Sequence, residues 1–171
     1  MGKIIGLFLF LCGIGYLLYS WILEQKKQNK RILDMIVFVQ KSLFVMEEER
    51  VQIVDYFQTY RGGGNILEDT LQEIARLLDQ KIYPEGEMVW EAVFREKEQE
   101  WNLDEEIFDI ILGLGKGFFG KKRSENVAFL RKGLLELEQQ QKKKKERDAK
   151  ERKVWIPVGM LGGMMFVIIL I

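Results

Sequence analysis

The sequence predicts an all-α fold in which two terminal transmembrane helices flank an antiparallel helical bundle. Two stretches, 4–23 and 154–171, carry no charged residue, and a bilayer core about 30 Å thick is crossed by about 20 helical residues. Between them, apolar residues recur every three or four positions, as they do on one face of a helix, and no segment alternates as a strand does. The breaks between these periodic segments are short, which is typical of neighbouring helices that run antiparallel.

The two uncharged stretches are predicted to be membrane spans. A cleaved signal peptide is the alternative for 4–23, but this stretch exceeds the usual apolar region of about 7–15 residues and has no small-residue cleavage site before Lys26. A buried core helix is the alternative for 154–171, but a helix that is apolar on every face has no soluble core to enter here. Trp21 and Trp155 fit aromatic rings at the level of the lipid headgroups.

Basic residues predict the orientation of the spans. Residues 1–31 hold five basic and one acidic residue, and residues 142–153 hold eight basic and three acidic residues. We call 26–31 and 142–153 the basic collars. Because basic residues that flank spans stay in the cytoplasm, we expect the region between the collars to be cytoplasmic and both termini to lie across the membrane. The collars are expected to rest on anionic membrane lipids, and nucleic acid is the disfavoured alternative partner because the lysine run adjoins a span.

The region 32–141 is predicted to be one small helical bundle domain, followed by the basic juxtamembrane segment 142–153. It holds 22 acidic and 13 basic residues, a net charge of −9, although the whole chain sums to zero. An acidic domain is therefore tethered between two basic collars.

The first helix of the bundle is expected to continue directly from the first span, because no glycine or proline interrupts the chain between Tyr16 and Tyr60. Its inward residues are Ile32, Ile36, Val39, Leu43, Met46, Ile53 and Phe57. After three glycines, Asn65 is predicted to cap a second helix, with Glu68 completing a capping box. The inward residues of that helix are Leu67, Leu71, Ile74 and Leu78.

Three further helices follow a break at Tyr83-Pro84-Glu85-Gly86. The third buries Val89, Trp90, Val93, Phe94 and Trp101. Either Asn102 or Asp104 caps the fourth, and Ser124 caps the fifth. The fourth directs Ile107, Ile110, Ile111 and Leu114 inward, and the fifth has an apolar seam of Val127, Leu130, Leu134 and Leu137.

The residue inventory argues against an enzyme. The chain has no histidine and a single cysteine, Cys12, inside the first predicted span, so histidine-based triads, the usual zinc sets and an intramolecular disulfide are excluded. Gly115 to Gly120 satisfies G-x-G-x-x-G, but a dinucleotide site needs this pattern after a strand, so we interpret it as a flexible turn between two helices. We expect no catalytic residue, no cofactor and no metal.

Two acidic clusters are candidate docking sites for a partner. They are Glu47, Glu48 and Glu49 on the first bundle helix, and Asp104, Glu105 and Glu106 at the start of the fourth. A solvated surface is the alternative, since adjacent like charges point to different sides of a helix.

The last predicted span contains a G-x-x-x-G pair, Gly159 and Gly163. Small residues at this spacing let a neighbouring helix approach closely. The neighbour can be another subunit or a second copy of the chain, which would make a homo-oligomer. The alternative is that glycine is simply frequent in spans.

The order of several short motifs resembles the stage III sporulation protein AB family of endospore-forming bacteria. The resemblance covers nearly the whole chain. It depends on the first span with Lys3 at its start, Leu71-Gln72-Glu73-Ile74-Ala75, Trp90-Glu91-Ala92-Val93, Leu112-Gly113-Leu114-Gly115, a turn near Gly120, and Leu161-Gly162-Gly163 in the last span.

This resemblance implies a component of a secretion-like channel assembly in the mother-cell membrane around the forespore. It also implies a helical domain similar to that of the type II secretion platform protein, and no catalytic residue. The expected role is a scaffold that docks other stage III assembly subunits, including a secretion-type ATPase. The alternative is a membrane-anchored helical adaptor or regulator outside such a machine.

Overall fold

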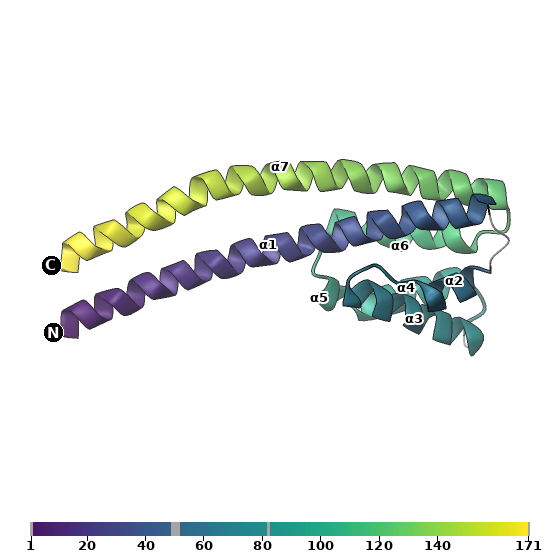
Figure 1. Cartoon of the computed structure of the whole chain (residues 1–171), viewed down its shortest axis with the longest axis horizontal. Coiled ribbons are helices and arrows are strands. Elements are labelled where there is room, and N and C mark those ends of the chain that lie inside the picture. Colours follow the sequence, from purple (N-terminus) through teal and green to yellow (C-terminus); the bar gives the residue numbers. More distant parts are fainter. Residues whose placement is uncertain (1, 49–51, 82, 171) are drawn as a thin grey trace. The chain divides into compact units, whose positions relative to one another are not determined.

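The computed structural model describes residues 2–48, 52–81 and 83–170, and it omits the side chains of 2–11, 48, 160, 163, 164 and 166–170. Within these ranges the chain forms α-helices and no β-strand, which confirms the predicted all-α class. The helices are α1 (Gly2–Glu48), α2 (Ile53–Thr59), α3 (Asn65–Asp79), α4 (Gly86–Glu96), α5 (Glu98–Trp101), α6 (Glu105–Phe119) and α7 (Arg123–Leu170) (Figure 1).

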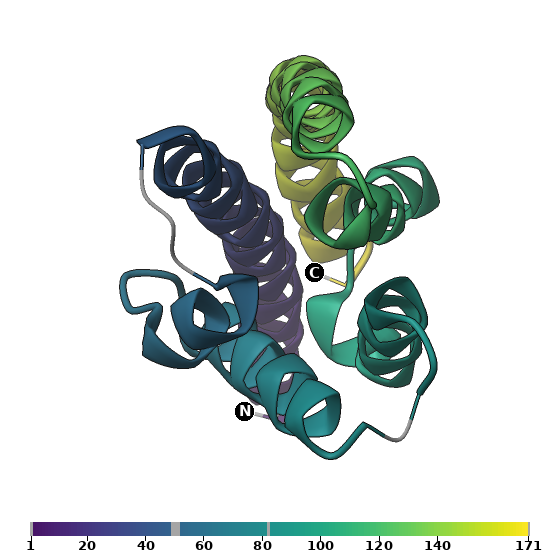
Figure 2. The same ribbon diagram turned by 90° about the vertical axis from the view of Figure 1, so that its right-hand side faces the viewer.

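The chain divides into two compact units. The bundle unit comprises 30–142, and the stem unit comprises 1–29 with 143–171. The long helices α1 and α7 contribute one part to each unit. In the bundle unit, α4 packs against α3 and α6, and α2 packs against α3. Figure 2 looks along the helices of this unit.

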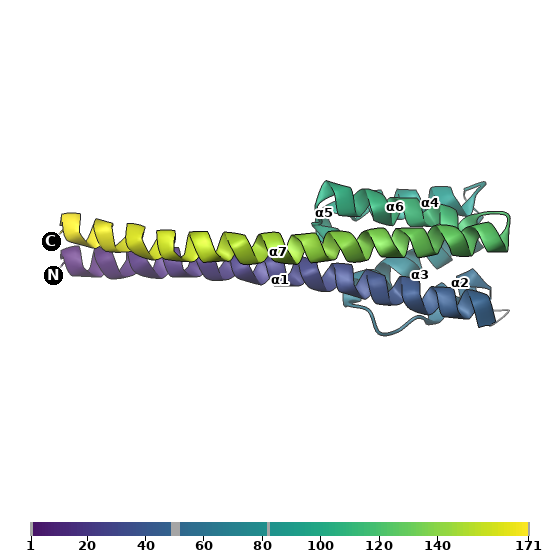
Figure 3. The same cartoon turned by 90° about the horizontal axis from the view of Figure 1, so that it is seen from above.

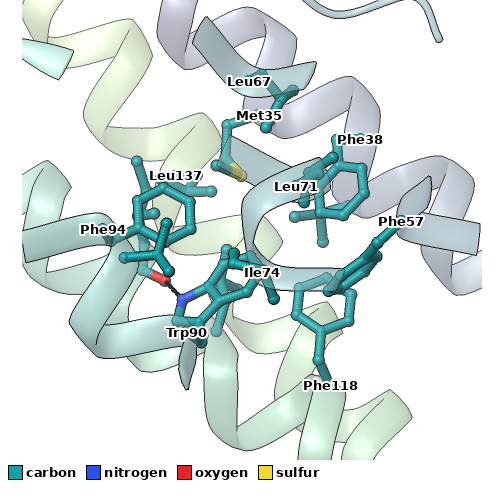
Figure 4. Close-up of a cluster of buried hydrophobic side chains, with 14 of the residues drawn as sticks. Met35, Phe38, Phe57, Leu67, Leu71, Ile74, Trp90, Phe94, Phe118 and Leu137 are labelled. Carbon is teal, nitrogen blue, oxygen red and sulfur yellow. Dashed lines mark hydrogen bonds between the residues drawn. The ribbon is translucent and has the colours of Figure 1, made fainter. Parts of the chain in front are cut away.

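Aromatic side chains fill much of the core of the bundle unit. Trp90, Trp101, Phe38, Phe57 and Phe94 are completely buried. The Trp90 ring lies 4.6 Å from that of Phe94, and the Phe38 ring lies 5.6 Å from that of Phe57. Figure 4 shows these rings with Leu67, Leu71 and Ile74 of α3 beside them. Such ring pairs stabilise a core by about 0.5–1.5 kcal/mol each beyond the area that they bury.

Gly115 and Gly117 of the G-x-G-x-x-G pattern lie inside α6, so the predicted turn was wrong for them, whereas Gly120 follows the helix as its extended C-cap residue. A Cβ on Gly115 would lie 2.9 Å from the Cδ1 atom of Trp90, and one on Gly117 would lie 2.6 Å from the Cγ atom of Leu130. The Trp90 indole also donates a 2.9 Å hydrogen bond to the carbonyl of Ile111. These glycines therefore let α4 and α7 approach α6 closely. The packing that results stabilises the fold by more than the low helix propensity of glycine destabilises α6.

The first bundle helix is shorter than predicted. It ends at Glu48, and a separate helix, α2, begins at Ile53. The helix that continues from the first apolar stretch through Ile36 and Val39 is confirmed, but its extension to Phe57 was wrong. Tyr56, Phe57 and Tyr60 place their rings 5.0–6.1 Å from that of Phe38. This packing requires the chain to turn back on α1, and helix propensity alone gives no sign of it.

The first loop of the bundle is held by carboxylates, in a different manner from the predicted capping box. Gly64 occupies the N-cap position of α3 and makes no side-chain cap bond. Glu68 accepts a hydrogen bond from the Gly62 backbone N–H at 2.9 Å, and Asp34 accepts one from the Gly64 N–H at 3.0 Å. Gly62 has a φ of 118°, which a residue with a Cβ adopts only with strain.

Two other predicted caps are resolved by the structure. Asp104 is the N-cap residue of α6, whereas Asn102 ends the short helix α5 in a left-handed conformation with a φ of 42°. Ser124 lies inside α7, which begins at Arg123, so its predicted capping role was wrong. Trp101 lies on α5 and not on the preceding helix, but it is buried as expected.

The stem unit pairs α1 with α7 in antiparallel orientation, as Figure 3 shows from above. Arg152 donates a 2.8 Å hydrogen bond to Gln25, and Asn29 donates a 2.7 Å bond to Asp148. α7 runs without a break from the bundle unit into the stem unit and contains Pro157. None of the helices, searched over the described residues, combines the length and the apolarity needed to cross a membrane. Parts of both predicted spans, 4–23 and 154–171, lie outside the side chains that the structure describes.

A pair of glycine variants tests the packing of α6. Gly115→Ala should lower the free energy of unfolding by about 1–3 kcal/mol, because its methyl group would clash with Trp90. Gly113→Ala is the matched control. A Cβ at Gly113 meets nothing within 4 Å, so we expect it to stabilise α6 by about 0.5–1 kcal/mol through helix propensity. Chemical denaturation measures both, and equal effects of the two variants would contradict this packing.

Candidate interaction surfaces

Of the first acidic cluster the structure describes one side chain, that of Glu47, which is exposed but already paired with another residue of the protein. Glu47 on α1 forms an ion pair with Arg131 on α7, and the Met46 carbonyl beside it accepts a hydrogen bond from Arg123. The side chain of Glu48 and the whole of Glu49 lie outside the described residues. The structure therefore assigns Glu47 a bond between α1 and α7 that the sequence did not predict.

The second acidic cluster is more accessible. Glu105 and Glu106 are exposed in the first turn of α6, while Asp104 is partly buried at its N-cap position. Glu106 accepts a 3.3 Å hydrogen bond from Gln140 of α7. Carboxylates here also face the positive end of the helix dipole. Of the two predicted docking sites, this one offers the larger described acidic surface.

An apolar groove follows the outer side of α1 in the bundle unit. Gln40, Lys41, Phe44, Val45 and Tyr56 line it, and it encloses about 370 Å³. The Phe44 side chain is 60 % exposed. This groove was not predicted from the sequence, because Phe44 falls outside the inward-facing positions of its helix.

Tyr56 lines this groove and is half-buried, whereas the nearby Tyr60 is buried, and its hydroxyl group has no hydrogen-bond partner in the described part of the chain. Burial raises the pKa of Tyr60 to about 12, and the nearby Tyr56, Asp34 and Glu68 add to the effect. Burial also raises the pKa of Tyr56, and the hydroxyl of Ser42 partly opposes this shift. Ionisation of the buried Tyr60 ring is therefore disfavoured in the folded protein.

Where its side chains are described, the stem unit buries polar groups between α1 and α7. Gln25, Lys144 and Asp148 are each less than 7 % exposed. Gln25 donates a 3.5 Å hydrogen bond to Glu151 and accepts one from Arg152. Buried polar pairs of this kind fix the register of two paired helices, at some cost in stability. These buried pairs were not predicted from the sequence, because a segment so rich in lysine and arginine is typical of a helix that is wholly solvated.

Next to this polar layer lies a cavity of about 440 Å³, lined by Leu18, Trp21, Glu151 and Trp155. Two of these residues come from α1 and two from α7. Both indoles had been predicted to lie at headgroup level, but the cavity that they share with a carboxylate depends on the pairing of the two helices. It could not be found from either helix alone.

The candidate packing residue Gly159 faces α1 of the same chain. A Cβ at this position would lie 3.1 Å from Leu18 Cδ1. This contact is made within one chain, whereas the sequence suggested a neighbouring subunit or a second copy. The side-chain position of Gly163 lies outside the described residues.

Chemistry-bearing residues do not converge in the described part of the chain. No group of three or more histidine, cysteine, aspartate or glutamate side chains there could hold a metal ion. The thiol of Cys12 is exposed and unpaired. The candidate interaction surfaces include the acidic start of α6, the groove on α1 and the cavity in the stem unit.

These features define an all-helical protein with a small aromatic-cored bundle and a polar two-helix stem. The family model described as stage III sporulation protein AB matches residues 3–171. The chain therefore belongs to the stage III sporulation protein AB family, and the predicted resemblance is confirmed. No curated protein and no solved structure gives a match.

The raised pKa of Tyr60 predicts a loss of stability in alkali. The neutral phenol stabilises the fold fully below its ordinary pKa of 10.0, and this contribution is lost as the pH rises through about 12. We expect Tyr60→Phe to reduce the fall in unfolding free energy between pH 9 and 12, by about 1–3 kcal/mol, and to leave stability at pH 7 unchanged or higher because the hydroxyl has no partner. Tyr83→Phe, at an exposed ring, is the control. An identical alkaline loss in wild type and Tyr60→Phe would refute the assignment.

A second pair of glycine variants tests the close approach of Gly159 to Leu18 of α1. Gly159→Leu should clash with Leu18 and lower the thermal midpoint of the full chain in detergent, at a cost of about 1–3 kcal/mol. Gly162→Leu is the control, because nothing lies within 4 Å of its Cβ position. Circular dichroism during heating reports both. If Gly159→Leu weakened only the association between chains and left the midpoint unchanged, the contact with α1 would be wrong.

Proposed function

We propose that this protein is a non-enzymatic scaffold in a sporulation-specific, secretion-like channel assembly in the mother-cell membrane around the forespore. Its stretches 4–23 and 154–171 span the membrane twice, and the bundle unit faces the cytoplasm. The observation that carries the proposal is family membership over residues 3–171. The scaffold docks other subunits of the assembly, and its cytoplasmic partner is the ATPase.

The charge distribution supports this arrangement. The region 32–141 carries a net charge of −9, and the collars on either side carry the excess of basic residues. Basic collars bind anionic lipid at about 1 kcal/mol per residue near the surface. The acidic bundle is repelled from the same lipid and is left available to a basic soluble partner, whose association it accelerates.

The start of α6 is the docking surface that the contacts favour. Glu105 and Glu106 are exposed there, whereas Glu47 is already paired with Arg131. A charge that already has an ion-pair partner on the same protein gains less from a second partner than one without such a pair. The attraction is screened over a Debye length of about 8 Å at physiological salt, so binding should weaken as salt is added.

The second candidate function is a membrane-anchored helical adaptor or regulator outside any secretion-like machine. The stem and bundle would serve that role equally well, because neither depends on the identity of the partner. A gene for a secretion-type ATPase beside the gene of this protein would favour the scaffold. Capture of the assembly subunits with the full chain from sporulating cells separates the two functions.

Charge reversal tests docking directly. We expect the full chain in detergent to bind the purified ATPase, and Glu105→Lys with Glu106→Lys to weaken binding at least tenfold at low salt. The control pair is Glu96→Lys with Glu100→Lys, which makes the same change of charge at exposed positions on α4 and α5. Surface plasmon resonance at several salt concentrations measures the affinities.

Three outcomes discriminate among the explanations. Loss of binding in the α6 pair alone supports a local docking surface. Equal loss in both pairs indicates a response to net charge only. Wild-type affinity in both pairs, with no dependence on salt, would leave the acidic residues as a solvated face and remove this part of the proposal.

A further inference from the structure

The cavity in the stem unit has the composition of a site for an organic cation. Trp21 and Trp155 supply two indole rings, Leu18 an apolar wall and Glu151 a carboxylate. The face of an indole attracts a cation that lies within about 6 Å of the ring centre, and pairs or cages of such rings recognise ammonium groups. A carboxylate on the same wall adds charge and accepts hydrogen bonds.

Glu151 keeps capacity for a ligand. Its contacts inside the protein are long: 3.5 Å to the Gln25 amide and 4.0 Å to Arg147. A carboxylate offers about four acceptor positions, so two weak contacts do not saturate it. The neighbouring guanidinium of Arg152 is directed elsewhere, since its Nε atom donates a 2.8 Å bond to Gln25.

The position of the cavity indicates the source of the cation. On one side lies the polar layer of Gln25, Asn29 and Asp148, and on the other side the two apolar stretches continue to the termini. This is the level at which a span meets the headgroups, where tryptophan rings are enriched. Arg147 of the collar lies one helical turn before Glu151 on α7, and its Nε atom is 4.0 Å from the Glu151 carboxylate. A phosphate placed beside the ammonium would therefore also meet positive charge.

We propose that the cavity formed by Leu18, Trp21, Glu151 and Trp155 binds the headgroup of a phospholipid with a primary ammonium, phosphatidylethanolamine. The inference depends on the proposed two-span arrangement and adds a specific lipid to it. The ammonium lies against the two indoles and donates to Glu151, and the phosphate lies toward the basic collar. A choline headgroup has no N–H to donate to the carboxylate, and a glycerol headgroup has no cation.

Native mass spectrometry of the full chain released from mixed vesicles tests the site. The vesicles contain equal amounts of phosphatidylethanolamine, phosphatidylcholine and phosphatidylglycerol with identical acyl chains. We expect the chain to retain phosphatidylethanolamine at least fivefold over phosphatidylcholine. Glu151→Gln should bring this ratio close to one, and Trp155→Leu should lower the retention of both lipids. Glu146→Gln is the control, because it makes the same change of charge at an exposed position in the same collar.

The outcomes separate the site from the arrangement on which it depends. A wild-type ratio in Glu151→Gln, or equal retention of the two lipids by the parent chain, overturns the site. If Glu146→Gln also lost the preference for phosphatidylethanolamine over phosphatidylcholine, only the net charge of the collar would matter. This result also overturns the site. A chain that fails to float with the vesicles overturns the two-span arrangement itself. Circular dichroism of each variant verifies that the helices persist, so that a changed ratio reports the cavity and not unfolding.

Discussion

The contact between the Trp90 indole and Gly115 sets how closely α4 and α6 approach, and the rest of the bundle unit depends on it. The indole is completely buried and its N–H is satisfied by the Ile111 carbonyl, so this large side chain carries no unpaired polar group. Its ring lies 5.0 Å from that of Phe118, which lies 5.5 Å from that of Phe38 on α1. Ring contacts thus connect the short helices to the long one.

The bundle and the stem use opposite chemistry to hold helices together. The bundle excludes water with rings and aliphatic side chains, which supplies most of the free energy of folding. The stem instead buries Gln25 and Asp148 in hydrogen-bonded pairs with α7 and α1. Such pairs contribute little net stability, but they penalise every other register, because a shift would leave buried polar groups without partners. The bundle unit therefore contributes most of the stability, and the stem unit sets the register of α1 against α7.

The helical periodicity of the sequence was sufficient to predict the fold class and much of the core. Leu67, Leu71 and Ile74 repeat at helical spacing, and all three are completely buried. The order of short motifs was likewise sufficient to identify the family. Local signals failed where tertiary packing overrides them. Ser124 has the chemistry of a cap, but α7 begins one residue earlier. Glycine favours turns, yet Gly115 and Gly117 lie inside a helix, because Trp90 and Leu130 occupy the space that a Cβ would fill.

The interaction surfaces were harder to predict, since they arise from residues far apart in the chain. The exposed acidic residues at the start of α6 follow from composition alone. The pairing of Glu47 with Arg131 and the cavity between Trp21 and Trp155 require knowledge of which residues of α1 and α7 face one another. That register is fixed by buried polar contacts, and their partners cannot be deduced from one helix at a time.

Pro157 gives the end of α7 a mechanical property that the rest of the helix lacks. Proline has no backbone N–H, so the carbonyl of Lys153, four residues earlier, receives no hydrogen bond from it. A helix bends most easily where one rung of its hydrogen-bond ladder is missing. Contacts with α1 flank this weak point on both sides, because the polar pairs hold α7 before it and Gly159 lies against Leu18 after it. Pairing with a second helix thus supports α7 at the place where its own backbone supports it least.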